Sequence, residues 1–184
     1  MTDSFGTEIH PVPVSITNPA DWGDISRTLS EKSGVPSTVD LDSLTSMLSG
    51  AIALLFEADR VDDIDLLRGT FSEQVIAQCQ RYQGYLEGGR PLSANTYLIG
   101  VPNNAINPCI RVRNTITDET TNSESHTVEQ FWDLEVNRQT LVGLSSCPHC
   151  GAPMKLGELI CKYCHTDVRM NITAPLLVVK LETY

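Results

Sequence analysis

Cys147-Pro-His-Cys150-Gly-Ala-Pro-Met-Lys-Leu-Gly-Glu-Leu-Ile-Cys161-Lys-Tyr-Cys164 contains two Cys-x-x-Cys pairs that are separated by ten residues. Each pair curls the backbone so that two sulfurs converge, and two such pairs supply the four thiolates of a tetrahedral zinc site. Glycine at position 151 suits the tight left-handed turn that lets backbone N–H groups face the sulfurs. A disulfide pair or redox-active thiols are the alternative. The spacing predicts one zinc ion per chain, held by the four cysteines Cys147, Cys150, Cys161 and Cys164.

This predicted site is structural rather than catalytic, because four cysteines leave no position on the ion for water or substrate. His165 follows the last ligand and could replace a cysteine, but the four sulfurs already complete the shell. Cys79 and Cys109 fall in apolar periodic segments, where we expect buried free thiols rather than a bridge or a catalytic thiol. Free thiols fit a reducing cytoplasm.

The chain has 184 residues, enough for one ordinary domain and a small appendage. We expect no membrane span, because we find no apolar run that approaches the roughly 18–20 residues that cross a bilayer. The first residues lack a basic region and an apolar region, so we expect no secretory signal and a cytoplasmic location.

The formal net charge is −10, and four thiolates with one zinc ion (−4 + 2) make it about −12. Within residues 147–170, three basic side chains oppose two acidic ones, so with the metal centre's −2 this segment carries about −1. An acidic surface repels phosphate backbones and anionic lipid headgroups. We therefore expect no nucleic-acid partner.

Residues 1–38 are rich in proline, serine and threonine, and we expect an N-terminal arm that is largely extended or flexible, with a short helix over 21–32. Trp22 is predicted to dock this arm onto its own domain, or alternatively onto a partner. Next, a long helix is predicted from near Asp40 or Asp42, either of which can cap it, to Arg60. A short helix over 61–67 follows, and a third helix begins at the capping box Thr70-Phe-Ser-Glu73.

The apolar period then changes from 3.6 to 2. Strands are predicted over 94–101, 106–117, 127–136 and 174–184, with inward-facing side chains at Ile110, Val112, Trp132, Leu134 and Val179. The fold class is α+β: helices packed on a curved antiparallel sheet, cone-like, with a small zinc ribbon inserted before the last strand. The predicted cone-like domain comprises 39–144 and 171–184, and the ribbon comprises 145–170. Because the helices have their own core, we expect them to persist when the ribbon loses its metal.

This layout resembles the Tim-forty-four-like domain, named for the motor-adaptor family of the mitochondrial inner-membrane translocase, within the nuclear-transport-factor-two-like cone superfamily. The likeness covers about residues 39–184 and is carried by Phe56 with Asp62 and Asp63, by Leu67-Arg-Gly-Thr-Phe-Ser72 and by Phe131-Trp-Asp-Leu-Glu-Val136. Bacterial members carry a Cys-Pro-x-Cys-Gly-Ala-Pro ribbon, which Cys147-Pro-His-Cys-Gly-Ala-Pro153 resembles. The resemblance implies a non-enzymatic adaptor with a concave apolar pocket.

We expect no catalytic residues, because the four histidines and the predicted inward positions form no acid–base or nucleophilic constellation. Asp133 and Glu135 are expected to form a solvated outer face. The first hypothesis is a cytoplasmic zinc-binding adaptor that binds another protein of unknown identity. The second is a carrier of an apolar small molecule or lipid in the cone pocket, and the third is an unrecognised enzyme of the cone superfamily.

Overall fold

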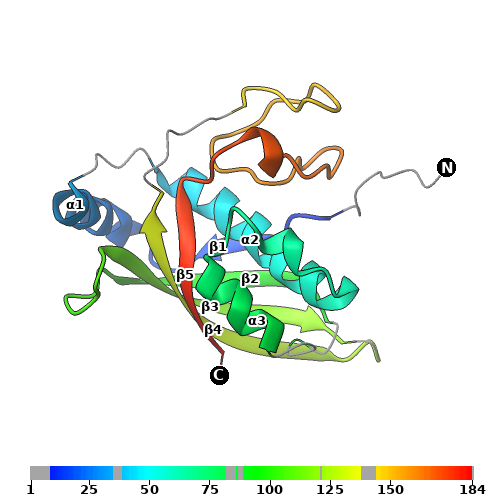
Figure 1. Ribbon diagram of the computed structural model, residues 1–184, viewed down its shortest axis with the longest axis horizontal. Helices are drawn as coiled ribbons and strands as arrows, with labels where there is room; N and C mark the ends of the chain where they lie inside the picture. The colour runs from blue at the N-terminus through cyan, green and yellow to red at the C-terminus, as the bar shows by residue number, and fades with distance from the viewer. Residues whose placement is uncertain are drawn as a thin grey trace.

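A computed structural model describes residues 9–34, 39–81, 86, 89–120, 122–137 and 144–183. Three α-helices pack on one five-stranded sheet, which stays open rather than closing into a barrel (Figure 1). This confirms the predicted α+β class. In chain order, the elements are β1 (Val14–Ile16), η1 (Pro19–Asp21), α1 (Trp22–Ser33), α2 (Leu41–Val61), η2 (Ile64–Leu67), α3 (Glu73–Arg81), β2 (Arg90–Gly100), β3 (Cys109–Glu119), β4 (Ser125–Val136), η3 (Arg169–Asn171) and β5 (Leu176–Thr183).

The strands lie in the order β1-β2-β3-β4-β5, and every pair is antiparallel except β1 with β2. The four predicted strands are antiparallel as expected, and the sheet is mixed because the short strand β1, which was not predicted, pairs in parallel with β2. The sequence Val14-Ser-Ile16 is too short to show an alternation and stands in a segment with frequent prolines.

The long helix α2 begins where it was predicted. The Asp40 carboxylate accepts a hydrogen bond from the Ser43 N–H at 2.7 Å, which lowers the pKa of Asp40 below its usual value. By length and composition α2 could cross a membrane, so the expectation that no stretch qualifies was wrong in that respect. However, 67% of its apolar window is buried inside the fold, as in the core helix of a folded domain, and the evidence for a span is weak.

The third helix is capped differently from the prediction. Ser72, rather than Thr70, caps the helix: the Ser72 Oγ accepts a hydrogen bond from the Val75 N–H at 3.3 Å. Thr70 instead belongs to a short backbone ladder with β5: its carbonyl accepts the Val178 N–H at 2.9 Å, and the Ser72 N–H donates to the Val178 carbonyl at 2.8 Å. Tertiary pairing thus shifts the helix start by two residues. The described part of α3 ends at Arg81, and its predicted end near Gly88 lies outside the described residues.

The core lies between the sheet and helices α2 and α3, with α2 packed on β1 and β2 and α3 on β5 (Figure 1). Ile110, Val112, Trp132 and Leu134 are fully buried, as predicted. Val179 is only partly buried, and that prediction was wrong: Leu176, Val178 and Leu181 are the buried residues of β5. A register shift opposite Asp133 and Leu134 inserts one extra residue into β5, so the inward alternation changes phase there.

The N-terminal arm is folded against the domain over much of its described length. The predicted short helix is present as α1, which has 12 residues, and β1 extends the sheet, so "largely extended or flexible" understates its structure. Trp22 is buried in the main core together with Ile25 and Leu29. This confirms that Trp22 docks the arm onto its own domain.

Candidate metal centre

The four predicted ligands meet at one point. Their sulfurs lie within 4.8 Å of one another, and the separations Cys147 Sγ–Cys164 Sγ and Cys150 Sγ–Cys161 Sγ are both 3.7 Å. Sulfurs bound tetrahedrally about 2.3 Å from a central zinc ion would lie about 3.8 Å apart, whereas a disulfide needs about 2.05 Å. The cluster has the size of a tetrahedral thiolate shell, and all four cysteines are free thiols.

Two hairpin turns with the same hydrogen-bond pattern present these sulfurs. In the first turn, the Gly151 N–H donates to the Cys147 carbonyl and the Cys147 N–H donates to the Ala152 carbonyl, both at 2.8 Å. In the second turn, the His165 N–H donates to the Cys161 carbonyl at 2.8 Å and the Cys161 N–H to the Thr166 carbonyl at 2.9 Å. The residue after each second cysteine is left-handed, with φ of +77° at Gly151 and +59° at His165. The left-handed turn predicted at Gly151 is present, and His165 adopts the same conformation without the freedom of glycine.

Protons and a metal cation would compete for the sulfurs of the cluster. Hydrogen bonds from Thr166, whose Oγ1 lies 3.2 Å from Cys164 Sγ, lower the pKa of the Cys164 thiol to about 5. At Cys150 a backbone hydrogen bond from Ala152 favours the thiolate, but burial and the neighbouring sulfurs outweigh it and raise the pKa of this thiol to about 12. The neighbouring sulfurs therefore share protons, which a bound cation would replace. Four soft sulfur ligands in a tetrahedral arrangement suit zinc.

This arrangement predicts how metal affinity depends on pH. Because the neighbouring sulfurs raise the pKa of the Cys150 thiol and a metal binds only thiolates, binding must release at least one proton, so acid favours the metal-free form. We expect the apparent zinc affinity to rise at least about tenfold per pH unit between pH 6 and pH 8. Competition with a chromophoric chelator at several pH values measures this slope. An affinity that does not change with pH would show that the sulfurs are already ionised in the free protein.

The cysteine-containing segment, residues 144–170, packs against α2 rather than projecting from the domain (Figure 1). Leu159 and Ile160 belong to the main core, and a methyl group at Gly50 of α2 would lie only 3.0 Å from Leu159 Cβ. Gly157 has φ of +92°, and a methyl group there would lie 2.5 Å from the Ser43 carbonyl oxygen. The expectation that the helices have a core independent of this segment was therefore wrong, because two of the segment's side chains help to form that core.

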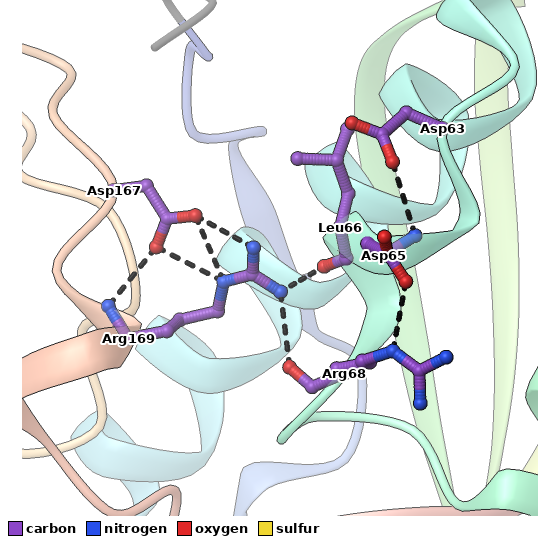
Figure 2. A network of polar contacts seen from close by, with 6 residues as sticks. All are labelled: Asp63, Asp65, Leu66, Arg68, Asp167 and Arg169. Atoms are coloured by element: carbon purple, nitrogen blue, oxygen red, sulfur yellow. Dashed lines mark hydrogen bonds and ion pairs between the residues drawn. The ribbon is translucent and has the colours of Figure 1, made fainter. Parts of the chain in front are cut away.

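Arg169 fastens the end of the segment to the turn between α2 and α3 (Figure 2). Its Nη1 donates to the carbonyls of Leu66 and Arg68, the latter at 3.2 Å. The other side of the guanidinium group binds Asp167, with Nη2–Oδ2 at 2.6 Å and Nε–Oδ1 at 2.9 Å. The Arg169 side chain is only 13% exposed, so these hydrogen bonds are largely shielded from water. These contacts were not predicted, because nothing in the spacing of Asp167 and Arg169 in the sequence shows which carbonyls the arginine binds.

The contacts of Arg169 predict a measurable loss of stability. Arg169→Gln would remove the guanidinium donors of two carbonyls and leave the Asp167 carboxylate with only the backbone N–H of residue 169, so we expect a loss of about 2 kcal/mol in the free energy of unfolding. Arg68→Gln is the matched control, since the Arg68 side chain is 53% exposed and its ion pairs lie at the surface; we expect a loss within about 0.5 kcal/mol. Urea denaturation of both variants checks the difference, and equal losses would contradict the role given to Arg169.

Two of the four histidines contact each other. The ring of His10 lies against that of His165, with centroids 4.0 Å apart and planes tilted by 55°, so the N-terminal arm contacts the second cysteine turn. His126, which is 56% exposed, lies 3.3 Å from the buried carboxylate of Asp118. Within the described residues, no serine or cysteine makes a contact with His126 that would complete a nucleophilic site. Cys79 and Cys109 are buried free thiols as predicted, and burial raises the pKa of Cys109 to about 11.

The sequence analysis missed a group of polar side chains on the inner face of the sheet. Thr96, Asn114 and Gln130 are fully buried and lie opposite one another on β2, β3 and β4. Thr96 Oγ1 donates to Asn114 Oδ1 at 2.7 Å, and Gln130 Oε1 accepts the Trp132 Nε1–H at 2.9 Å. Each stands two positions from a buried apolar residue of the same strand, and this spacing could have identified them in the sequence as inward-facing. Asp133 faces outward as predicted but is not solvated, because two hydrogen bonds from Arg111 at 2.8 and 2.9 Å cover it.

The fold and the site define an α+β domain that carries a four-cysteine cluster, able to bind a metal ion, before its last strand. No family model matches the chain, no curated protein matches it, and no solved structure matches it. The resemblance to the Tim-forty-four-like domain stays a prediction.

Proposed function

We propose that the protein is a non-enzymatic, zinc-binding interaction module, an adaptor whose metal segment helps to form a binding surface for another protein. The observation that carries the proposal is the closed cluster of four sulfurs within 4.8 Å. A metal ion with four cysteine ligands has no free position for a substrate, so its contribution is to fix the backbone around it. The backbone fixed here packs on α2, contacts the N-terminal arm and reaches the α2–α3 turn.

The inner face of the sheet supports a binding role over catalysis. Its central side chains, including Trp132, Asn114 and Val112, are fully buried by the helices. The polar members of this face bind neighbours within the sheet: Thr96 binds Asn114, and Gln130 binds Trp132. A reacting group needs access to substrate, and these residues have none in the described structure.

Metal analysis and partner isolation test the proposal together. We expect one zinc per chain in the full protein, and a co-isolated protein that is lost from Cys161→Ser. The same substitution at Cys79, outside the cluster, should retain both the zinc and the partner. A purified protein without bound metal would overturn the proposal, and so would a captured protein whose binding does not depend on the metal.

A further inference from the structure

We infer that the groove between the N-terminal arm, α2 and the cysteine-containing segment binds an extended acidic peptide of a partner protein, which adds a strand to the free edge of β1. The inference rests on the proposed function, because the metal would hold one wall of this groove. It adds to that function the place of binding and the chemistry of the partner segment.

The first step concerns the edge of the sheet. β1 is the outermost strand, and the Ala94 N–H donates to the Pro13 carbonyl at 2.9 Å while the Thr17 N–H donates to the Thr96 carbonyl at 2.8 Å. Residues 13 and 17 thus direct these groups toward β2. Because backbone groups alternate along a strand, those of Val14 and Ile16 point away from β2. No described strand pairs with this side of β1, and a strand edge of this kind can accept another extended chain.

A groove lies beside this edge. It has a volume of about 240 Å³, and its walls come from residues 11–14 of the arm, from the α2 residues Thr45, Ser46 and Ser49, and from the segment that contains Lys155 and Lys162. Val14 of β1 is part of this lining, so the groove reaches the edge strand of the sheet. Ser49 Oγ donates to the Val12 carbonyl at 2.5 Å and holds the arm against α2. Pro11 and Pro13 restrict the arm to extended backbone, so little ordering is needed before a strand is added.

The charge of the groove selects an acidic peptide. Lys155 and Lys162 line it, and neither ammonium group forms an ion pair with a carboxylate in the described part of the chain. Glu158 is the one acidic residue of the lining, and its carboxylate accepts a hydrogen bond from the Lys155 N–H at 3.3 Å. Two positive charges and one negative charge make the lining +1 in a chain of net charge −10. A peptide with glutamate or aspartate side chains complements this local charge.

The metal fixes the wall that carries the lysines. Lys155 stands between the two cysteine pairs, and Lys162 lies inside the second pair. Ile160 from the same segment both lines the groove and belongs to the main core. Loss of the metal should therefore displace both ammonium groups from the groove.

A fluorescein-labelled octapeptide of alternating valine and glutamate tests the inference with the full-length, zinc-loaded protein. Fluorescence anisotropy should show saturable one-to-one binding. Lys155→Glu with Lys162→Glu should weaken it at least about tenfold. Lys32→Glu with Lys180→Glu changes the net charge equally on α1 and β5 and should weaken it less than about twofold, by long-range repulsion alone. An N-methylated version of the peptide, which cannot pair as a strand, should bind at least about tenfold more weakly than the parent.

Four results of this experiment would contradict the inference. Absence of saturable binding to zinc-loaded protein, equal weakening by the two double variants, or full binding of the N-methylated peptide would overturn the inference. So would equal binding of a single-stranded oligodeoxynucleotide of the same charge, since the site would then select charge alone. Zinc content and circular dichroism are measured on every sample. A folded protein without zinc would contradict the proposed function. A zinc-loaded protein that does not bind the peptide would contradict only the inference about the groove.

Discussion

Cys161→Ser is expected to abolish metal binding and to destabilise the whole domain. The Cys161 sulfur is fully buried in the cluster, and the adjacent Leu159 and Ile160 are buried in the main core against α2. Releasing these two side chains should cost roughly 3–6 kcal/mol, at about 1.5–3 kcal/mol each. In a chain of this length that corresponds to a fall of about 10–20 °C in the unfolding midpoint. Elemental analysis and differential scanning calorimetry of the purified variant measure the two effects.

Cys79→Ser is the control for this experiment, because Cys79 is a buried cysteine on α3, outside the cluster. It should keep one zinc per chain and lose only about 1–3 kcal/mol, the cost expected for burying a hydroxyl in place of a thiol. If Cys161→Ser instead lost its metal with an unchanged unfolding midpoint, the segment would be an independent appendage. The contacts of Leu159 with α2 would then contribute nothing to stability.

The metal ligands were predictable from the sequence because the information is local. Two cysteines three positions apart, followed by a residue that accepts a left-handed conformation, determine each turn almost without help from the rest of the chain. The second turn shows the limit of this reasoning, since His165 stands where glycine would be expected and is nevertheless left-handed. Its hydrogen bond to the Cys161 carbonyl is the same as that of Gly151 to Cys147.

The helices and long strands were predictable because their apolar periods are regular over many residues. Val179 shows why the last strand was misread: an extra residue in β5 changes the alternation after Val178, and a pattern of four consecutive apolar residues gives no sign of where the phase changes. β1 was missed because its three residues depend on pairing with Ala94 and its neighbours, about eighty positions further along the chain.

The position of the cysteine-containing segment on the domain could not be predicted, for a related reason. It depends on Gly157 against Ser43, on Leu159 against Gly50 and on Arg169 against the carbonyls after η2. Each contact joins residues that are about a hundred positions apart, and one partner is often a backbone atom, which leaves no trace in composition. The metal ligands could therefore be predicted from the sequence, whereas the contribution of the segment to the stability of the domain could be inferred only from the structure.

Trp132→Ala is expected to cost about 3–5 kcal/mol in the free energy of unfolding. The indole ring is fully buried at the centre of β4, and the Phe71 ring packs edge-on against it, with centroids 5.6 Å apart and planes at 72°. The substitution opens a cavity, and it also leaves Gln130 Oε1 without the donor that lies 2.9 Å away. Trp132→Phe, the control, keeps most of the ring volume but removes the same donor, so it should cost clearly less if packing dominates. Chemical denaturation of the zinc-loaded proteins separates the two contributions. A loss below about 1 kcal/mol for Trp132→Ala would mean that the ring is not part of the core. Equal losses for both variants would assign the effect to the hydrogen bond.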